Sequence, residues 1–193
     1  MAARFLRHRG ISRTTAGTAA DRRFAHNGFD IWRFDRTSGR DPLEPGAQTL
    51  AEGLKALRAA GYRRILVAGH SRGGWIALGV LRQPGVADAI VALSPAAHGA
   101  RPERREQAMQ DWAALWQSAA PARTRIVLVQ LAEDPLDPDP AARRAIAQRA
   151  AARNGMPFLS IYLPPAPMGH MGAYEPAMEV RFGRQIAAFV IPR

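Results

Sequence analysis

A serine between two glycines is the first feature of this sequence that could carry out a reaction: Gly69-His70-Ser71-Arg72-Gly73. A short apolar run at residues 65–69 leads into this segment, and an apolar stretch at residues 75–81 follows it. This order predicts a strand, a sharp turn and a helix, with the side chain of Ser71 projecting from the turn. Small flanking residues prevent collisions between the strand and the helix at such a turn. The pattern predicts that Ser71 is a nucleophile.

The two glycines have a simpler explanation, because glycine also allows close packing of helix on strand in many doubly wound folds. The strand–turn–helix order favours the nucleophile. The backbone N–H of Arg72 would then begin the helix and donate to the negative oxygen that develops on a substrate. We include Arg72 and His70, which flank the serine, among the candidate oxyanion and substrate-binding residues.

In this context the segment resembles the nucleophile elbow of the α/β-hydrolase superfamily, and the resemblance covers the chain from about residue 28 onward. It implies a serine activated by a histidine that an acid orients, in the chain order serine, acid, histidine. Among the members, the chain is similar to small serine esterases of the dienelactone-hydrolase-like kind, without a large lid. The resemblance implies no cofactor and no metal.

The resemblance places the acid after the apolar run at residues 125–131, where the sequence carries Glu133, Asp134 and Asp137. Asp134, which precedes a proline, matches the acid loop of the family best; Asp137 is the reserve and Glu133 comes third. Both aspartates could instead form a turn or cap the helix that begins near Pro140. Asp134 is our candidate for the acid.

The histidine implied by the resemblance is His170, in a Gly-His pair between the apolar run at residues 158–163 and the last helix. His8 and His26 fit this role less well, the first because it lies near the N-terminus and the second because it lies at a helix end. His98 follows the strand after the elbow, and we expect it to line the substrate pocket.

In the family, a second oxyanion donor comes from a loop near the start of the fold. The spacing of His8 and Gly10 matches the family's His-Gly signature only loosely, and it makes Gly10 and Ile11 the candidates. The chain lacks the family's first two strands, which implies a minimal version or a start site that omits an N-terminal part.

Helical and strand patterns alternate along the rest of the chain, with no internal repeat and no linker, so we expect a single α/β domain over residues 1–193. The predicted α/β-hydrolase fold has a mostly parallel central sheet of about six strands with helices on both faces. Within residues 1–17, residues 3–10 are interpreted as a short edge strand that runs into a loop, which we slightly favour over a transit peptide of similar composition. The remaining elements that we expect are strands at residues 29–34, 64–69, 89–93, 125–131 and 158–163 and helices at residues 18–27, 48–60, 75–81 and 103–118.

One helical stripe required a choice between two interpretations. Met109, Trp112, Leu115 and Trp116 share one face of the helix predicted at residues 103–118. Large apolar side chains at this spacing usually belong to a core, although they could also form a lid over a substrate. We expect core packing and an active site without a large lid.

Composition narrows the class of protein. Of the 193 residues 47% are hydrophobic and 22% charged, as in globular proteins. The net charge of +11 would suit a nucleic-acid partner, but the arginines form scattered pairs beside alanine-rich segments, so we expect solvated faces and no nucleic-acid partner. No apolar stretch approaches the roughly 18 residues of a membrane span. Residues 1–20 also lack the apolar block of a secretory signal, which slightly favours a cytoplasmic location.

The predicted activity is hydrolysis of a small-molecule ester or other acyl substrate through an acyl-enzyme formed on Ser71. Thioesterases and acyltransferases use the same triad and remain alternatives, because a fold does not select among them. A non-catalytic small-molecule-binding protein on a hydrolase scaffold is the alternative of another class. The acyl group, the leaving group and the oligomeric state are open.

Overall fold

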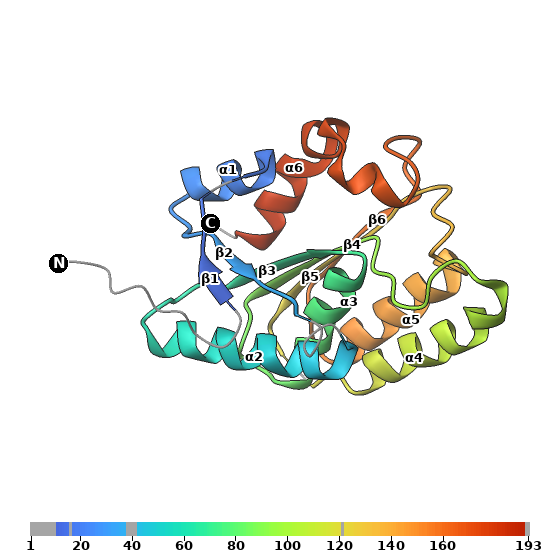
Figure 1. Cartoon of the computed structure of the whole chain (residues 1–193), viewed down its shortest axis with the longest axis horizontal. Helices are drawn as coiled ribbons and strands as arrows, with labels where there is room; N and C mark the ends of the chain where they lie inside the picture. Colours follow the sequence, from blue (N-terminus) through green and yellow to red (C-terminus); the bar gives the residue numbers. More distant parts are fainter. Residues whose placement is uncertain (1–10, 16, 38–41, 121, 192–193) are drawn as a thin grey trace.

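The structure is a computed structural model that describes residues 11–15, 17–37, 42–120 and 122–191 as layers of helices around a parallel sheet (Figure 1). Its helices are α1 (Ala19–His26), α2 (Leu43–Ala59), α3 (Arg72–Gly79), α4 (Arg105–Gln117), α5 (Pro140–Arg153) and α6 (Pro176–Val190), with the 3-10 turns η1 (Val80–Arg82), η2 (Pro102–Arg104) and η3 (His170–Tyr174). Its strands are β1 (Ile11–Arg13), β2 (Trp32–Phe34), β3 (Leu66–His70), β4 (Ala89–Leu93), β5 (Arg125–Gln130) and β6 (Phe158–Tyr162). None of the helices in these ranges is long and apolar enough to cross a membrane.

The central sheet is parallel, with the strand order β3-β4-β5-β6. Successive side chains of a strand point to opposite faces, and both faces are covered. Ile90 and Ala92 of β4 pack into the core with α2 to α5, while Ala89 and Val91 pack into the core with α6. Figure 1 shows α2, α4 and α5 along one face and α1 and α6 over the other. The predicted helices on both faces are confirmed.

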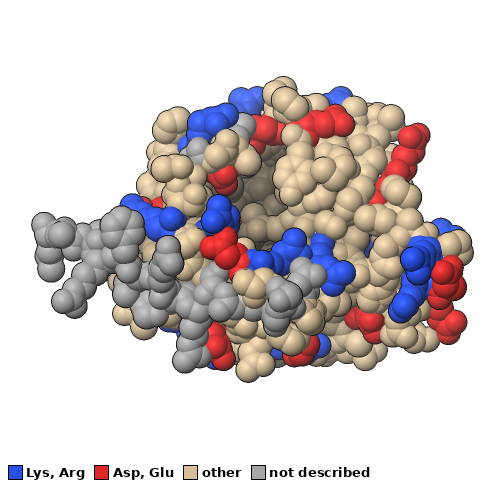
Figure 2. Space-filling model, viewed as in Figure 1, with Lys and Arg blue, Asp and Glu red and all other residues tan. Residues whose placement is uncertain are grey.

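The remaining strands of the described residues form a separate antiparallel pair, in which Ile11 of β1 lies opposite Phe34 of β2. The expected six strands are therefore divided between a sheet of four and a sheet of two. A cavity of about 710 Å³ lies between β2 and β3, and its lining includes the apolar side chains of Phe24, Trp32 and Leu66 together with charged residues. Figure 2 shows this face of the molecule hollowed below α1. The edge strand expected at residues 3–10 lies outside the described residues.

Two helix starts illustrate what local sequence can predict. Thr18, the first residue of the helix expected at residues 18–27, is the N-cap of α1: it accepts a hydrogen bond from the backbone N–H of Asp21 at 3.0 Å, and the Asp21 carboxylate accepts one from Thr18 N at 2.8 Å. In contrast, α2 begins at Leu43, five residues before the expected start at residue 48. Pro45 lies in the first turn of α2, where the N–H that proline lacks would have no partner within the helix. The helix expected at residues 48–60 therefore began too late, after a proline that the first turn of α2 tolerates.

The aromatic stripe of α4 belongs to the core. Trp112 is 0% exposed and Trp116 1% exposed, and Leu115 is also buried. Trp112 packs edge-on against Trp75 of α3, with ring centroids 5.2 Å apart. The expected core packing of this stripe is confirmed.

The carboxyl edge, where the four parallel strands end, concentrates unusual backbone conformations. All non-glycine residues with positive φ in the described ranges lie there: Ser71 (55°), Ser94 (41°), Glu133 (58°) and Leu163 (43°). Each follows a different strand of the parallel sheet. Side chains disfavour this region by about 1–2 kcal/mol per residue, so the sheet stores strain along one edge.

Candidate active site

Ser71 occupies a turn between the last residue of β3 and the first residue of α3, with φ 55° and ψ −125°. Its backbone N–H donates to the carbonyl of Leu93 at 3.0 Å, and its carbonyl accepts from the N–H of Trp75 at 3.1 Å. One bond ties the turn to β4 and the other ties it to α3. The strained conformation is held from both sides, and it sets the serine at the carboxyl edge.

Glycine is needed at this turn, although not at both of the positions that the sequence indicated. A Cβ on Gly69 would lie 2.3 Å from the carbonyl oxygen of Gly73, and a Cβ on Gly74 would lie 2.9 Å from that of Gly69. A Cβ on Gly73 would meet nothing within 4 Å, because Gly73 borders the cavity between β2 and β3. Close approach therefore requires Gly69 and Gly74, and the expectation for Gly73 is wrong.

His170 and Asp134 meet at the same edge. Nδ1 of His170 lies 2.9 Å from Oδ2 and 3.1 Å from Oδ1 of Asp134. The Asp134 side chain is 2% exposed and that of His170 is 13% exposed. Since a carboxylate can only accept, the neutral imidazole carries its proton on Nδ1 and leaves Nε2 as an acceptor. This is the protonation that a general base needs.

His70 connects this pair to the serine turn. Its Nε2–H donates to the backbone carbonyl of His170 at 2.8 Å, and the two rings lie 4.6 Å apart, centroid to centroid. The ring of Tyr174 packs on the other side of His70, at 4.7 Å. Burial lowers the pKa of His70, and the neighbouring His170 ring lowers it further, while the bond to the His170 carbonyl opposes the shift. A neutral His70 thus fixes the loop that carries His170 beside Ser71.

Asp137, the reserve acid, has a different partner. Its carboxylate pairs with the guanidinium of Arg143 at 2.8 Å and accepts from the Gln130 amide at 2.8 Å. The side chains of Asp137 and Arg143 are 7% and 2% exposed. The cap of α5 is a third acid, Asp139, which accepts from Ala142 N at 2.9 Å. Three aspartates of one loop, residues 132–139, therefore have three separate functions, and only Asp134 contacts His170.

Arg143 is the main residue of this region that the sequence analysis missed. Its guanidinium lies 4.0 Å above the ring of Trp112 and donates to the carbonyl of Pro95 at 2.7 Å. It joins the acid loop, residues 132–139, to the loop after β4. A signal was available, because Arg143 shares a helical stripe with the buried residues Ala147 and Ala150. An arginine on the apolar stripe of a helix indicates a buried ion pair.

The candidate oxyanion residues lie in different parts of the structure. Arg72 is the first residue of α3, so its backbone N–H lies at the helix N-terminus beside Ser71. Ile11 is 4% exposed and packs against α2, where a Cβ on Gly53 would lie 3.1 Å from its side chain. Gly10 lies outside the described residues. Ile11 therefore belongs to the core around α2, and no second donor is assigned.

His98 lines a cavity beside the elbow, and its Nε2 lies 2.7 Å from the Asp111 carboxylate of α4. Its ring stacks on Trp75 at 5.7 Å. Within the described ranges, no group of three or more histidine or acidic side chains is arranged to hold a metal ion.

The sequence model of the alpha/beta hydrolase family matches residues 11–187. The chain belongs to the alpha/beta hydrolase family. This match confirms the resemblance seen at the elbow and the predicted fold class. No curated protein matches this alpha/beta hydrolase.

Solved structures with the same fold include enzymes. An esterase from Pyrococcus furiosus superposes with a TM-score of 0.54 at 16% identity, covering 86% of this chain and 73% of its own. An E-2-(acetamidomethylene)succinate hydrolase superposes with a TM-score of 0.55 at 13% identity, covering 91% of this chain and 87% of its own. At these identities the likeness concerns the fold. Together with the family match, it supports a hydrolase.

Proposed function

We propose that this alpha/beta hydrolase is a serine hydrolase that cleaves carboxylic esters through an acyl-enzyme. The observation that carries the proposal is the contact between His170 Nδ1 and Asp134 at 2.9 Å, held beside the strained turn of Ser71 by the bond from His70. The pair orients one imidazole nitrogen and leaves the other to accept a proton. A buried carboxylate, an oriented imidazole and a turn-borne serine together make an activated nucleophile.

In the first half of the reaction, Ser71 Oγ attacks the ester carbonyl carbon and its proton passes to His170 Nε2. The Asp134 carboxylate stabilises the imidazolium that forms. The tetrahedral intermediate collapses when His170 returns the proton to the departing alcohol. The product of this half is an ester between Ser71 and the acyl group.

In the second half, a water molecule gives a proton to His170 and attacks the acyl carbon. The second tetrahedral intermediate collapses when His170 returns this proton to Ser71 Oγ, which releases the carboxylic acid and restores the Ser71 hydroxyl. In both halves the carbonyl oxygen becomes negative, and the backbone N–H of Arg72 is the donor proposed to stabilise it. One such donor is worth about 10²–10³-fold in rate in related chemistry.

Labelling with a fluorophosphonate probe tests for an activated serine. The wild type is expected to bind the probe covalently, and Ser71→Ala and His170→Ala are expected to lose the label. The matched control is Ser94→Ala, because Ser94 has the same residue type and a positive φ at the end of the adjacent strand. Equal labelling of wild type and Ser71→Ala, or no labelling of either, would overturn the proposal.

Turnover then separates esters from the other acyl substrates. We expect p-nitrophenyl esters of short acids to be hydrolysed with a burst of p-nitrophenol close to the enzyme concentration, because the activated leaving group makes formation of the acyl-enzyme faster than its hydrolysis. A matched pair of oxygen ester and thioester with the same acyl chain gives the substrate class. A thioester preferred by more than about tenfold in kcat/KM would assign a thioesterase and contradict the ester assignment.

A further inference from the structure

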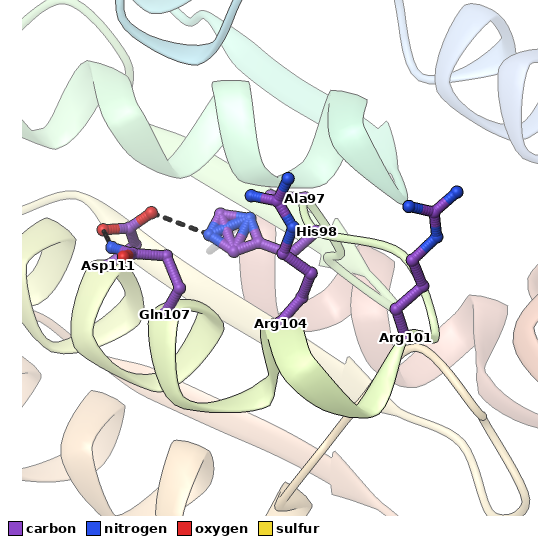
Figure 3. Close-up of a pocket in the computed structure, with 6 residues that line it drawn as sticks. All are labelled: Ala97, His98, Arg101, Arg104, Gln107 and Asp111. Atoms are coloured by element: carbon purple, nitrogen blue, oxygen red, sulfur yellow. Dashed lines mark hydrogen bonds and ion pairs between the residues drawn. The ribbon is translucent and has the colours of Figure 1, made fainter.

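A second cavity, here called the His98 cavity, opens beside the elbow with a volume of about 390 Å³. Six residues line it: Ala97, His98, Arg101, Arg104, Gln107 and Asp111 (Figure 3). It lies in the loop that follows β4, the strand next to β3. The guanidinium of Arg72, the residue after Ser71, donates to the carbonyl of Ala97 at 3.4 Å. The His98 cavity is therefore connected to the serine turn by a direct contact.

The charges in this cavity are unbalanced. Asp111 is the only carboxylate of its lining, and it is already bound by His98 Nε2 at 2.7 Å and by the Gln107 amide at 2.8 Å. Arg101 and Arg104 form no ion pair with any carboxylate of the described ranges. Figure 3 shows both side chains extending from the chain in the same direction, that of Arg104 next to His98 and that of Arg101 farther from it. Two guanidinium groups thus border the cavity without an ion-pair partner among the described residues, because Asp111 is bound by His98 and Gln107.

The pKa of His98 is sensitive to the charges around this cavity. Burial lowers the pKa of His98, and the positive charges of Arg104 and Arg72 lower it further, against the opposing effect of Asp111. Proximity of these arginines to a partly buried imidazole means that their field acts inside the cavity and not only at its mouth. An anion is the ligand that such a field attracts.

We propose that the His98 cavity is a carboxylate-binding subsite of the active site, so that the substrate is a small ester that also carries a free carboxylate. Guanidinium groups recognise carboxylates through paired N–H donors, and Arg101 and Arg104 supply these from the chain just before and at the start of α4. The lining is polar or charged except for Ala97, which suits a short acid and not a long apolar acyl chain. This proposal rests on the proposed function, and it names the substrate class of the same site.

The first test compares two esters of similar size, p-nitrophenyl butyrate and the mono-p-nitrophenyl ester of glutaric acid. We expect the double variant R101A/R104A to lose about 10–100-fold in kcat/KM on the glutarate ester, as for lost charge-assisted hydrogen bonds, and to stay within about twofold on the butyrate ester. Arg149→Ala is the matched control, because Arg149 is exposed on α5 and its removal changes the net charge equally without touching the cavity. An equal loss on both esters would overturn the subsite.

The second test needs no turnover. Binding of glutarate to Ser71→Ala, measured by calorimetry, is expected to weaken when R101A/R104A is added and to remain unchanged with Arg149→Ala. Arg104→Lys keeps the charge but not the paired donors, so intermediate affinity is expected. If glutarate binding depends on these arginines but the protein hydrolyses no ester, the proposed subsite stands and the proposed hydrolase is rejected. Ester hydrolysis with glutarate binding independent of the arginines would do the reverse.

Discussion

The carboxyl edge of the sheet carries two histidine–aspartate pairs that look alike at close range. His170 and Asp134 are 2.9 Å apart, His98 and Asp111 are 2.7 Å apart, and the imidazoles are 13% and 12% exposed. The carboxylates differ, since the Asp134 side chain is 2% exposed and that of Asp111 is 41% exposed. One pair lies beside a strained serine and the other beside unpaired arginines. A histidine–aspartate contact alone therefore does not indicate a function, because the residues around it decide what it can do.

Replacing the two aspartates separately tests this difference where the expected effect is largest. Asp134→Asn removes the charge that stabilises the imidazolium and disturbs the tautomer, so kcat on an ester is expected to fall by about 10⁴-fold. Asp111→Asn, the same change in the other pair, is expected to leave kcat on p-nitrophenyl butyrate within a factor of about three. Steady-state kinetics on both variants measure the contrast. Losses of similar size would mean that the two pairs do not differ in function.

Arg143 joins the two regions and offers the next largest effect. Its guanidinium contacts Asp137 on the side of the triad and the carbonyl of Pro95 on the side of the His98 cavity. Asp137→Asn leaves a buried positive charge without its counter-ion, so we expect the free energy of unfolding to fall by about 3–5 kcal/mol. Urea unfolding measures the loss, and Asp139→Ala, which removes only a helix cap, is expected to lose about 1 kcal/mol. A smaller loss for Asp137→Asn than for Asp139→Ala would show that this ion pair does not hold the regions together.

Sequence reasoning located one region, but in the other it indicated only His98, and the reason is physical. The serine turn and His170 could be predicted because a local pattern surrounds each, and the strands that carry them have apolar runs. Asp134 was preferred to Asp137 only through the resemblance, because both lie in the same loop. The physical reason lies in a third residue, since the buried Arg143 pairs with Asp137 and Asp134 contacts His170. His98 and Asp111 come from a loop and a helix whose approach no local pattern records. The separation of β2 from β3 is likewise a matter of tertiary packing.

The pH dependence of stability gives the smallest effect and treats both regions alike. Burial lowers the pKa of His70 near the triad and of His98 in its cavity. Below about pH 6.5 the unfolded chain therefore binds more protons than the folded chain. The free energy of unfolding falls as the pH drops through this range, and it stops falling once the pH is below the lowered pKa values of the two histidines. Urea unfolding at pH 7.5, 6.5 and 5.5 should show this slope of the free energy of unfolding against pH. In His70→Gln and in His98→Gln the slope is expected to be smaller, by the equivalent of less than one bound proton.

A control for that experiment is His26→Gln, since His26 is exposed at the end of α1. The slope of this variant is expected to equal that of the wild type. If His70→Gln and His98→Gln also kept the full slope, burial of the two imidazoles would not be the source of the pH dependence.

The positive-φ residues along the carboxyl edge have a consequence for improving this protein by engineering. Glu133 and Leu163 share the unfavourable backbone region of Ser71 but lie outside the proposed triad. Glycine or asparagine at these two positions relieves the conformation at a gain of about 1 kcal/mol each, which raises the melting temperature. At Ser71 the same exchange would remove the proposed nucleophile. Heat resistance and turnover are therefore opposed at one position of this edge, and the others are open to selection for thermostability.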